Sequence, residues 1–146
     1  MKRRRVYPFL LSACLLIGPG GFVENRDDYA YILEDGKATI TAYLGSDAKV
    51  LIPSMLGNMP VEAIGDGAFA GSDLRMAEIP GTVTAIGEGA FSQCENLFSV
   101  DMPHTVQFIG EGAFHGCSLI TVWTTDIGYV ADYMSANHIS YRFING

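Results

Sequence analysis

Two cysteines occupy equivalent places in stretches of this chain that repeat. Cys94 and Cys117 end the matching stretches 79–94 and 102–117. Stacked strands about 4.8 Å apart would bring the two side chains within reach of a disulfide. Unpaired cysteine is, however, often a small buried side chain, and Ser72 takes the same place in an earlier copy. We predict buried free thiols, with a disulfide as the alternative, and no zinc site, because no matching cysteine pair lies elsewhere.

Three carboxylates form a second repeated set. Asp66, Glu88 and Glu111 each follow a glycine of the repeat directly. Carboxylates stacked at strand spacing could hold a calcium ion. Each also begins a turn through Ala-Phe, where a negative charge interacts favourably with free amide hydrogens. This second explanation needs no ion, and we predict no cofactor; whether the column binds calcium stays open.

The histidines give no sign of catalysis. His104, His115 and His138 fall at three unrelated phases of the repeat. The chain has no nucleophile motif, no glycine-rich phosphate loop after a strand and no metal-ligand spacing. We therefore expect surface histidines and a protein that is not an enzyme.

These residues are positioned by the repeat itself. Pro80 matches Pro103 and Phe91 matches Phe114 at the same shift along the chain, and a looser copy begins at Ile52-Pro53 and contains Phe69. The extra length of that copy, around residues 57–60, predicts a turn-rich loop bulging from one coil. One coil cannot bury its own apolar side chains, so the copies must stack and share a core.

Written as a pattern, each copy is L-x-x-I-x-I-P-x-x-V-x-x-I-G-x-x-A-F-x-x-C. The fullest match consists of Leu97, Val100, Met102, Pro103, Val106, Ile109, Gly110, Ala113, Phe114 and Cys117. Over roughly residues 47–125 the chain resembles the BspA-like class of bacterial leucine-rich repeats. The resemblance implies a β-rich leucine-rich-repeat solenoid on an exported surface protein, often an adhesive one, and it implies no enzyme.

Each coil should contribute a short strand whose alternate side chains point inward. The expected inward residues are Leu97, Val100 and Met102, with Leu74, Ala77 and Ile79 before them and Leu119, Val122 and Thr124 after them. Proline after the strand has no amide hydrogen and ends the pairing. The repeat glycines mark places where the backbone bends or approaches closely. Phe69, Phe91 and Phe114 should stack in one buried column.

The same alternation predicts an outward strip that could bind a ligand. Its residues are Met76, Glu78, Ser99, Asp101, Thr121 and Trp123, with Lys49 and Leu51 extending it. Exposed aromatic side chains are common anchors of binding sites. Trp123 also lies next to the end of the repeat, so packing against a C-terminal cap is the alternative.

Both ends of the repeat carry signals of caps, as an open solenoid requires. Asp35-Gly36 between two β-rich runs predicts a hairpin cap over residues 28–46, before coils over 47–125. For a C-terminal cap over 126–146 we expect Asp126 to cap a helix with Ile127, Val130, Ala131 and Met134 on one face. Asn137 would end it in a left-handed conformation, and Ile139, Tyr141 and Phe143 would alternate in a last strand. The repeat domain would then span 27–146 and be complete.

The N-terminus has the character of an export signal. Four basic residues at positions 2–5 precede an apolar run from Val6 to Ile17, which is too short to span a bilayer. We predict a signal peptide or N-terminal anchor over residues 1–21. Leu11-Ser12-Ala13-Cys14 resembles a bacterial lipobox, so lipidation of Cys14 is an alternative to ordinary cleavage.

The net charge of the chain limits the classes of molecule that it could bind. Without the four basic residues of the leader, five Lys and Arg stand against 16 Asp and Glu, a net charge of −11. Such a surface repels phosphate backbones and anionic headgroups, so we expect no nucleic-acid partner and membrane attachment only through the N-terminus. The sequence predicts a secreted or cell-surface module that binds an extracellular protein or glycan. The rival hypothesis is a structural scaffold of the envelope without a ligand.

Overall fold

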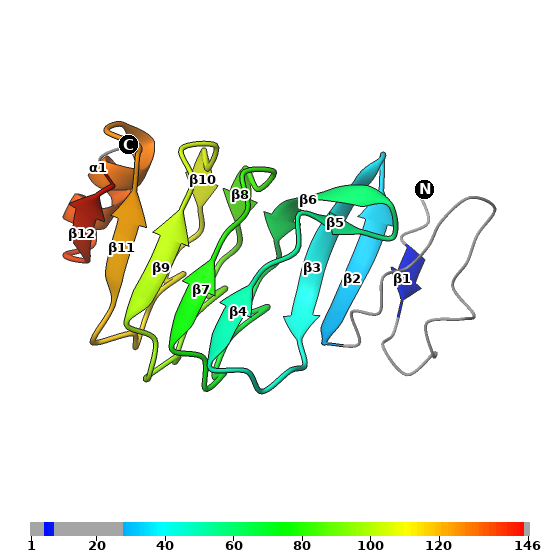
Figure 1. Cartoon of the computed structure of the whole chain (residues 1–146), viewed down its shortest axis with the longest axis horizontal. Helices are drawn as coiled ribbons and strands as arrows, with labels where there is room; N and C mark the ends of the chain where they lie inside the picture. Colours follow the sequence, from blue (N-terminus) through cyan, green and yellow to red (C-terminus); the bar gives the residue numbers. More distant parts are fainter. Residues whose placement is uncertain (1–4, 8–27, 145–146) are drawn as a thin grey trace.

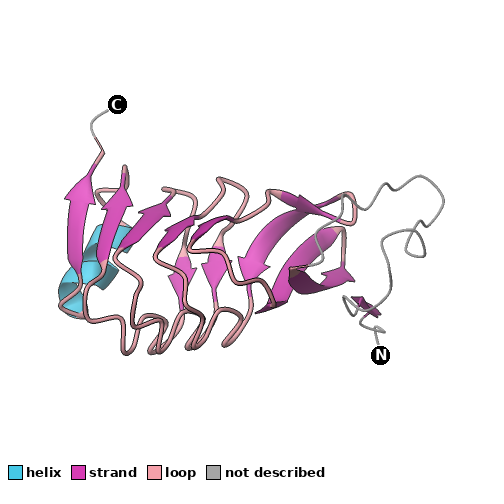
Figure 2. Ribbon diagram, turned by 60° about the horizontal axis from the view of Figure 1, so that its bottom comes forward, coloured by secondary structure: helices cyan, strands magenta, loops and turns pink. Residues whose placement is uncertain are grey.

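The computed structural model describes residues 5–7 and 28–144 and forms a solenoid of stacked coils (Figure 1). A five-stranded sheet, in the order β12-β11-β9-β7-β4, is parallel throughout. Its strands are β4 (Lys49–Leu51), β7 (Met76–Glu78), β9 (Ser99–Met102), β11 (Thr121–Thr124) and β12 (Ser140–Phe143). The coils lie side by side along the solenoid, with a helix at the C-terminal end (Figure 2).

A seven-stranded sheet forms the second layer. Its order is β1-β2-β3-β6-β8-β10, with β5 paired to β6. The strands are β1 (Arg5–Tyr7), β2 (Tyr29–Glu34), β3 (Lys37–Tyr43), β5 (Met55–Leu56), β6 (Met59–Ile64), β8 (Ala85–Ile86) and β10 (Phe108–Ile109). The three coils that contain β4, β7 and β9 thus contribute to both sheets, and the predicted β-rich solenoid is confirmed.

The core between the sheets contains the predicted inward residues. Leu97 and Val100 are fully buried and Met102 nearly so, and Leu74, Ala77 and Ile79 repeat this pattern one coil earlier. Val122 and Thr124 do the same one coil later. Each coil therefore completes the apolar layer of its neighbours, as stacking requires.

The phenylalanine column is confirmed. The ring of Phe91 stacks on Phe69 at a centroid separation of 4.9 Å and on Phe114 at 5.4 Å, and all three rings are buried. Tyr43 continues the column at its N-terminal end, 5.1 Å from Phe69. The rings join the hairpin and the coils in one aromatic stack.

The glycines after β6, β8 and β10 are needed because successive coils touch there. A Cβ added to Gly87 would lie 2.6 Å from the backbone nitrogen of Asp66. A Cβ added to Gly110 would likewise meet the backbone nitrogen of Glu88, and one added to Gly65 would lie 2.7 Å from the Ile40 carbonyl oxygen. Any side chain here would push two coils apart.

The N-terminal hairpin forms as predicted. β2 and β3 are antiparallel, and Asp35 and Gly36 between them have positive φ angles of 52° and 77°, as a two-residue turn of type I′ requires. β3 then pairs in parallel with β6, so the hairpin extends the seven-stranded sheet. β1 adds antiparallel to β2. The rest of the predicted leader, including Cys14, lies outside the described residues.

The insertion around residues 57–60 is more regular than the predicted loop. β5 and β6 pair in antiparallel fashion across Gly57 and Asn58, whose φ angles are 54° and 62°. Two adjacent residues with positive φ again make a tight hairpin turn. The extra length of the first coil is therefore a second hairpin.

The C-terminal cap is a helix followed by a strand, as predicted, with three corrections. α1 (Tyr129–Ala136) begins after Ile127, which is 85% exposed and not on the buried helical face. The N-cap residue is Gly128 and not the predicted Asp126, although the Asp126 carboxylate accepts hydrogen bonds from the N–H groups of Gly128 and Val130, both at 2.8 Å. The left-handed residue after the helix is His138, with φ of 57°, whereas Asn137 has φ of −99°.

β12 forms the predicted last strand, although its alternation is incomplete. Ile139 and Tyr141 pack against the core, but Phe143 is 47% exposed. β12 pairs in parallel with β11 and so covers the edge of the five-stranded sheet.

One inward residue of the last coil was predicted wrongly. Leu119 is 67% exposed, and Ile120 is buried in its place. Ile120 follows Leu97 by the same number of residues as Cys117 follows Cys94. The strand register, however, pairs Val122 with Val100, and this separation is one residue shorter. The last coil therefore lacks one residue between Ile120 and Thr121, where the preceding coil has Phe98.

Candidate functional site

The outward face of the five-stranded sheet brings the predicted strip into two straight rows. Strand register aligns the first row as Leu51, Glu78, Asp101, Trp123 and Arg142, and the second as Lys49, Met76, Ser99, Thr121 and Ser140. Parallel strands about 4.8 Å apart hold such rows at fixed spacing. The six predicted residues thus lie on one surface.

Five of the six residues are at least partly accessible, and Ser99 is the exception. Glu78, Asp101 and Trp123 are exposed, and Met76 and Thr121 are half-buried. Ser99 is only 9% exposed, because its short side chain lies between Met76 and Thr121 on the neighbouring strands. The accessible surface therefore consists mainly of the first row.

Trp123 is accessible despite its place beside the cap. Its indole is 39% exposed, and its neighbours in the row are Asp101 on β9 and Arg142 on β12. The cap strand thus continues the row past Trp123 and does not bury it. An aromatic face between an acidic and a basic side chain can contact both apolar and polar groups of a ligand.

The cysteine column is structural. Cys94 and Cys117 are buried free thiols. The sulfur of Cys94 donates to the Phe69 carbonyl at 3.1 Å, and that of Cys117 donates to the Phe91 carbonyl at 3.0 Å. A hydrogen bond to Cys94 and burial raise the pKa of the Cys117 thiol. Because each sulfur bonds to a carbonyl of the preceding coil, this column tethers adjacent coils.

One carboxylate of the acidic column, that of Asp66, contacts the backbone of the next coil. Oδ1 of Asp66 accepts a hydrogen bond from the Glu88 N–H at 2.8 Å. Within residues 5–7 and 28–144, no group of three or more His, Cys, Asp or Glu side chains is arranged to hold a metal ion. The Asp66 carboxylate thus has a structural role, as an acceptor for the amide of the next coil.

The histidines are exposed, and two of them line a hollow between the last coil and the cap. His104, His115 and His138 all lie on the surface. His115 and His138 border a hollow of about 380 Å³ together with Phe114, Cys117, Asn137 and Ile139. Ser118, Ser140 and the nearly buried thiol of Cys117 line the same hollow.

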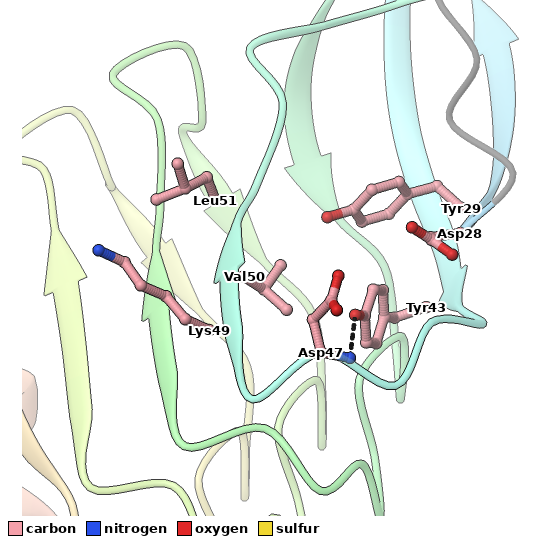
Figure 3. A pocket seen from close by; sticks show the side chains of 7 residues that line it. All are labelled: Asp28, Tyr29, Tyr43, Asp47, Lys49, Val50 and Leu51. Atoms are coloured by element: carbon pink, nitrogen blue, oxygen red, sulfur yellow. Dashed lines mark hydrogen bonds between the residues drawn. The ribbon is translucent and has the colours of Figure 1, made fainter.

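A groove at the opposite end was not predicted from the sequence. It has a volume of about 170 Å³ and lies where the hairpin meets β4 (Figure 3). Its lining residues are Asp28, Tyr29, Tyr43, Asp47, Lys49, Val50 and Leu51. These residues come from three separate elements. The sequence feature that could have indicated the groove is the pair of acidic residues, Asp28 and Asp47, that flank the hairpin.

Comparisons with known proteins agree with the coil geometry. The family model described as a BspA type leucine-rich repeat region, of six copies, matches residues 57–140. This match covers more than half of the chain, so the chain belongs to the BspA-type leucine-rich repeat family. Among curated proteins, no sequence matches the chain significantly.

Two solved structures show the same fold. A leucine-rich cell surface protein from Faecalibacterium prausnitzii is 36% identical with a TM-score of 0.61, over 73% of this chain and 30% of that one. The chain thus spans less than a third of that protein's length. A leucine-rich repeat protein from Bacteroides capillosus is 26% identical with a TM-score of 0.64, over 81% of this chain and 84% of that one.

The helix of the C-terminal cap is short, since α1 has 8 residues. Within the part of the chain that the structure describes, no helix has the length and apolar character needed to cross a bilayer.

Proposed function

We propose that this chain is a non-catalytic bacterial surface module that binds an extracellular protein or glycan. The binding face would be the first row of the five-stranded sheet, from Leu51 to Arg142. The observation that carries this proposal is the exposure of Trp123, the only tryptophan of the chain, between Asp101 and Arg142 on a rigid sheet. Rigid aromatic side chains lose little entropy on contact and dominate many interfaces.

The net negative charge of the chain and its similarity to a cell surface protein also support an extracellular binding module. The whole chain has a net charge of −7, which disfavours nucleic acid as the partner. The similar protein from Faecalibacterium prausnitzii is described as a cell surface protein. We place this chain outside the cytoplasm as well, either secreted or attached to the surface, with a lipid on Cys14 as one means of attachment.

One observation favours the scaffold as a second candidate. Glu78 and Asp101 separate the apolar side chains of Leu51 and Trp123 in the row. A dedicated ligand face commonly has a contiguous apolar patch. A structural role in the envelope would need no such patch.

The test measures retention of the full chain on a panel of extracellular-matrix and mucus components. Trp123 and Asp101 are replaced together by alanine, and circular dichroism confirms that the variant folds. A matched control replaces Phe98, which is 45% exposed but is not part of either row. We expect the double variant to lose retention and the F98A control to keep it. Equal retention by all three proteins would place binding elsewhere, and no retained component would favour the scaffold.

A further inference from the structure

The two ends of the solenoid close the five-stranded sheet differently. At the C-terminal end, β12 pairs with β11 and covers that edge. At the N-terminal end, the hairpin joins the seven-stranded sheet through β3 and β6. Consequently β4 is an edge strand, and within residues 5–7 and 28–144 its only strand partner is β7.

The register of β4 determines which backbone groups face outward. The Ala48 carbonyl accepts from the Met76 N–H, and the Ile52 N–H donates to the Glu78 carbonyl, both at 3.0 Å. Alternate residues of a strand point their backbone groups to opposite sides, so the N–H and C=O groups of Lys49 and Leu51 face the open edge. An unpaired edge of this kind is a template for an added strand.

The groove described above lies directly beside this edge. Figure 3 shows Asp28, Tyr29, Tyr43 and Asp47 on one side of β4, while the side chains of Lys49 and Leu51 point the other way. The Tyr43 hydroxyl accepts a hydrogen bond from the Asp47 N–H at 3.1 Å, and the Asp28 carbonyl accepts one from the Leu44 N–H at 2.7 Å. These two hydrogen bonds fix the backbone at Asp28 and Asp47 and so position both carboxylates.

The contents of the groove indicate the chemistry of its occupant. Asp28 and Asp47 are exposed carboxylates, and the ring of Tyr43 lies 5.4 Å from that of Tyr29. Tyr29 is buried, so the accessible groups are the two carboxylates and the half-buried ring of Tyr43. Carboxylates beside an aromatic ring suit a guanidinium or ammonium group. A volume of about 170 Å³ is below the roughly 300–1,000 Å³ of pockets for drug-sized ligands. It suits one long side chain.

We propose that β4 and this groove accept an extended peptide segment carrying an arginine or lysine. The segment adds as a strand to the open edge, with main-chain hydrogen bonds to Lys49 and Leu51, and its basic side chain enters between Asp28 and Asp47. Strand addition of this kind combines main-chain affinity with side-chain specificity. The site uses the backbone edge of β4 and not the side chains of the first row, so it does not rest on the function proposed for that row.

The test titrates the full chain, labelled with ¹⁵N, with a short end-capped peptide of alternating threonine and valine around a central arginine. We expect shifts of the Lys49 and Leu51 amide signals. Replacing Asp28 and Asp47 together by asparagine should weaken binding by about tenfold or more, since charge-assisted hydrogen bonds are lost. The matched control, Glu95→Gln, removes an exposed carboxylate from a later coil and should leave peptide binding unchanged.

Two further arms test the added strand itself. Leu51→Pro removes one edge donor without touching the bonds to β7, because proline is tolerated on edge strands, and it should abolish binding. A peptide methylated on the backbone nitrogens that face β4 tests the same bonds without altering the protein and should not bind. Equal binding of a peptide with central glutamate, binding unaffected by both L51P and methylation, or no binding by the native chain would each overturn the proposal. Self-association of the native chain through Lys49 and Leu51 would identify a second copy as the occupant and would also overturn it.

Discussion

Individual side chains in this protein form hydrogen bonds that link neighbouring coils. The thiols of Cys94 and Cys117 each donate to a carbonyl of the preceding coil, and Ser72 approaches the Cys94 sulfur at 3.4 Å. A small side chain with a donor group satisfies this position, which explains why both serine and cysteine occur there. The position requires no covalent bond.

We accordingly predict that both thiols remain reduced in the purified protein. Each sulfur is directed at a backbone carbonyl and is almost fully buried, so oxidants reach it poorly. Mass spectrometry of peptides from the unreduced, alkylated protein should show separate Cys94 and Cys117 peptides. A cross-linked pair with a mass lower by two hydrogens would contradict this prediction.

The repeat glycines predict a clear contrast between two substitutions. Gly87→Ala places a Cβ against the backbone of Asp66 and should destabilise the fold by about 1–3 kcal/mol, as overpacking does. Gly81→Ala is the matched control, because a Cβ there meets nothing within 4 Å. Urea unfolding of both variants measures the difference. Equal stability of the two variants would mean that the coils are not in close contact at Gly87.

At the scale of elements, stability comes from coils that complete one another. The stack from Tyr43 through Phe114 joins the hairpin to the three coils that follow. Tyr133 of α1 donates to the Gly110 carbonyl at 3.0 Å, and Tyr129 accepts from the Ile109 N–H at 2.9 Å. The helix thereby closes the seven-stranded sheet as β12 closes the other one.

The aromatic stack predicts a large effect of one truncation. Phe91→Ala opens a cavity between Phe69 and Phe114, and we expect a loss of about 3–5 kcal/mol in the free energy of unfolding. Phe98→Ala, at an exposed site outside the stack, should change stability by about 0.5 kcal/mol or less. Chemical unfolding monitored by circular dichroism compares them. Similar stabilities would show that the Phe91 ring does not support the core.

For the molecule as a whole, the stacking of the coils could be predicted from the sequence where the spacing of the repeat is regular. The constant shift between the two best copies was enough to pair Phe91 with Phe114, and the looser copy then added Phe69 to the column. The exposed Leu119 was missed because a one-residue deletion in the last coil leaves the motif before it intact. The left-handed residue at His138 was missed because asparagine is the commoner choice for that conformation.

The candidate site was predictable only in part, for a topological reason. Alternation placed Glu78, Asp101 and Trp123 on one surface, but the covering of Ser99 depends on its neighbours across strands. The groove beside β4 could not be predicted, because the sequence does not reveal which of two sheets the hairpin joins. Strand pairing between distant segments decides this.

The N-terminal residues predict export. The basic residues at positions 2–5 and the apolar run after them should direct the protein out of the cytoplasm, and the mature chain should begin before Tyr29. Terminal sequencing and mass measurement of the extracellular product check both points, and a diacylated Cys14 would identify membrane attachment. A product that retains Met1 in the cytoplasm would contradict export.

We propose that the first row of the five-stranded sheet binds an extracellular partner. The most direct measurement is an NMR titration of the ¹⁵N-labelled full chain with the component that it retains most strongly in the binding panel. We predict that the shifted signals concentrate on Glu78, Asp101 and the Trp123 indole N–H, at the middle of the row. Shifts confined to the seven-stranded sheet or to the C-terminal cap, with the row unchanged, would contradict the claim.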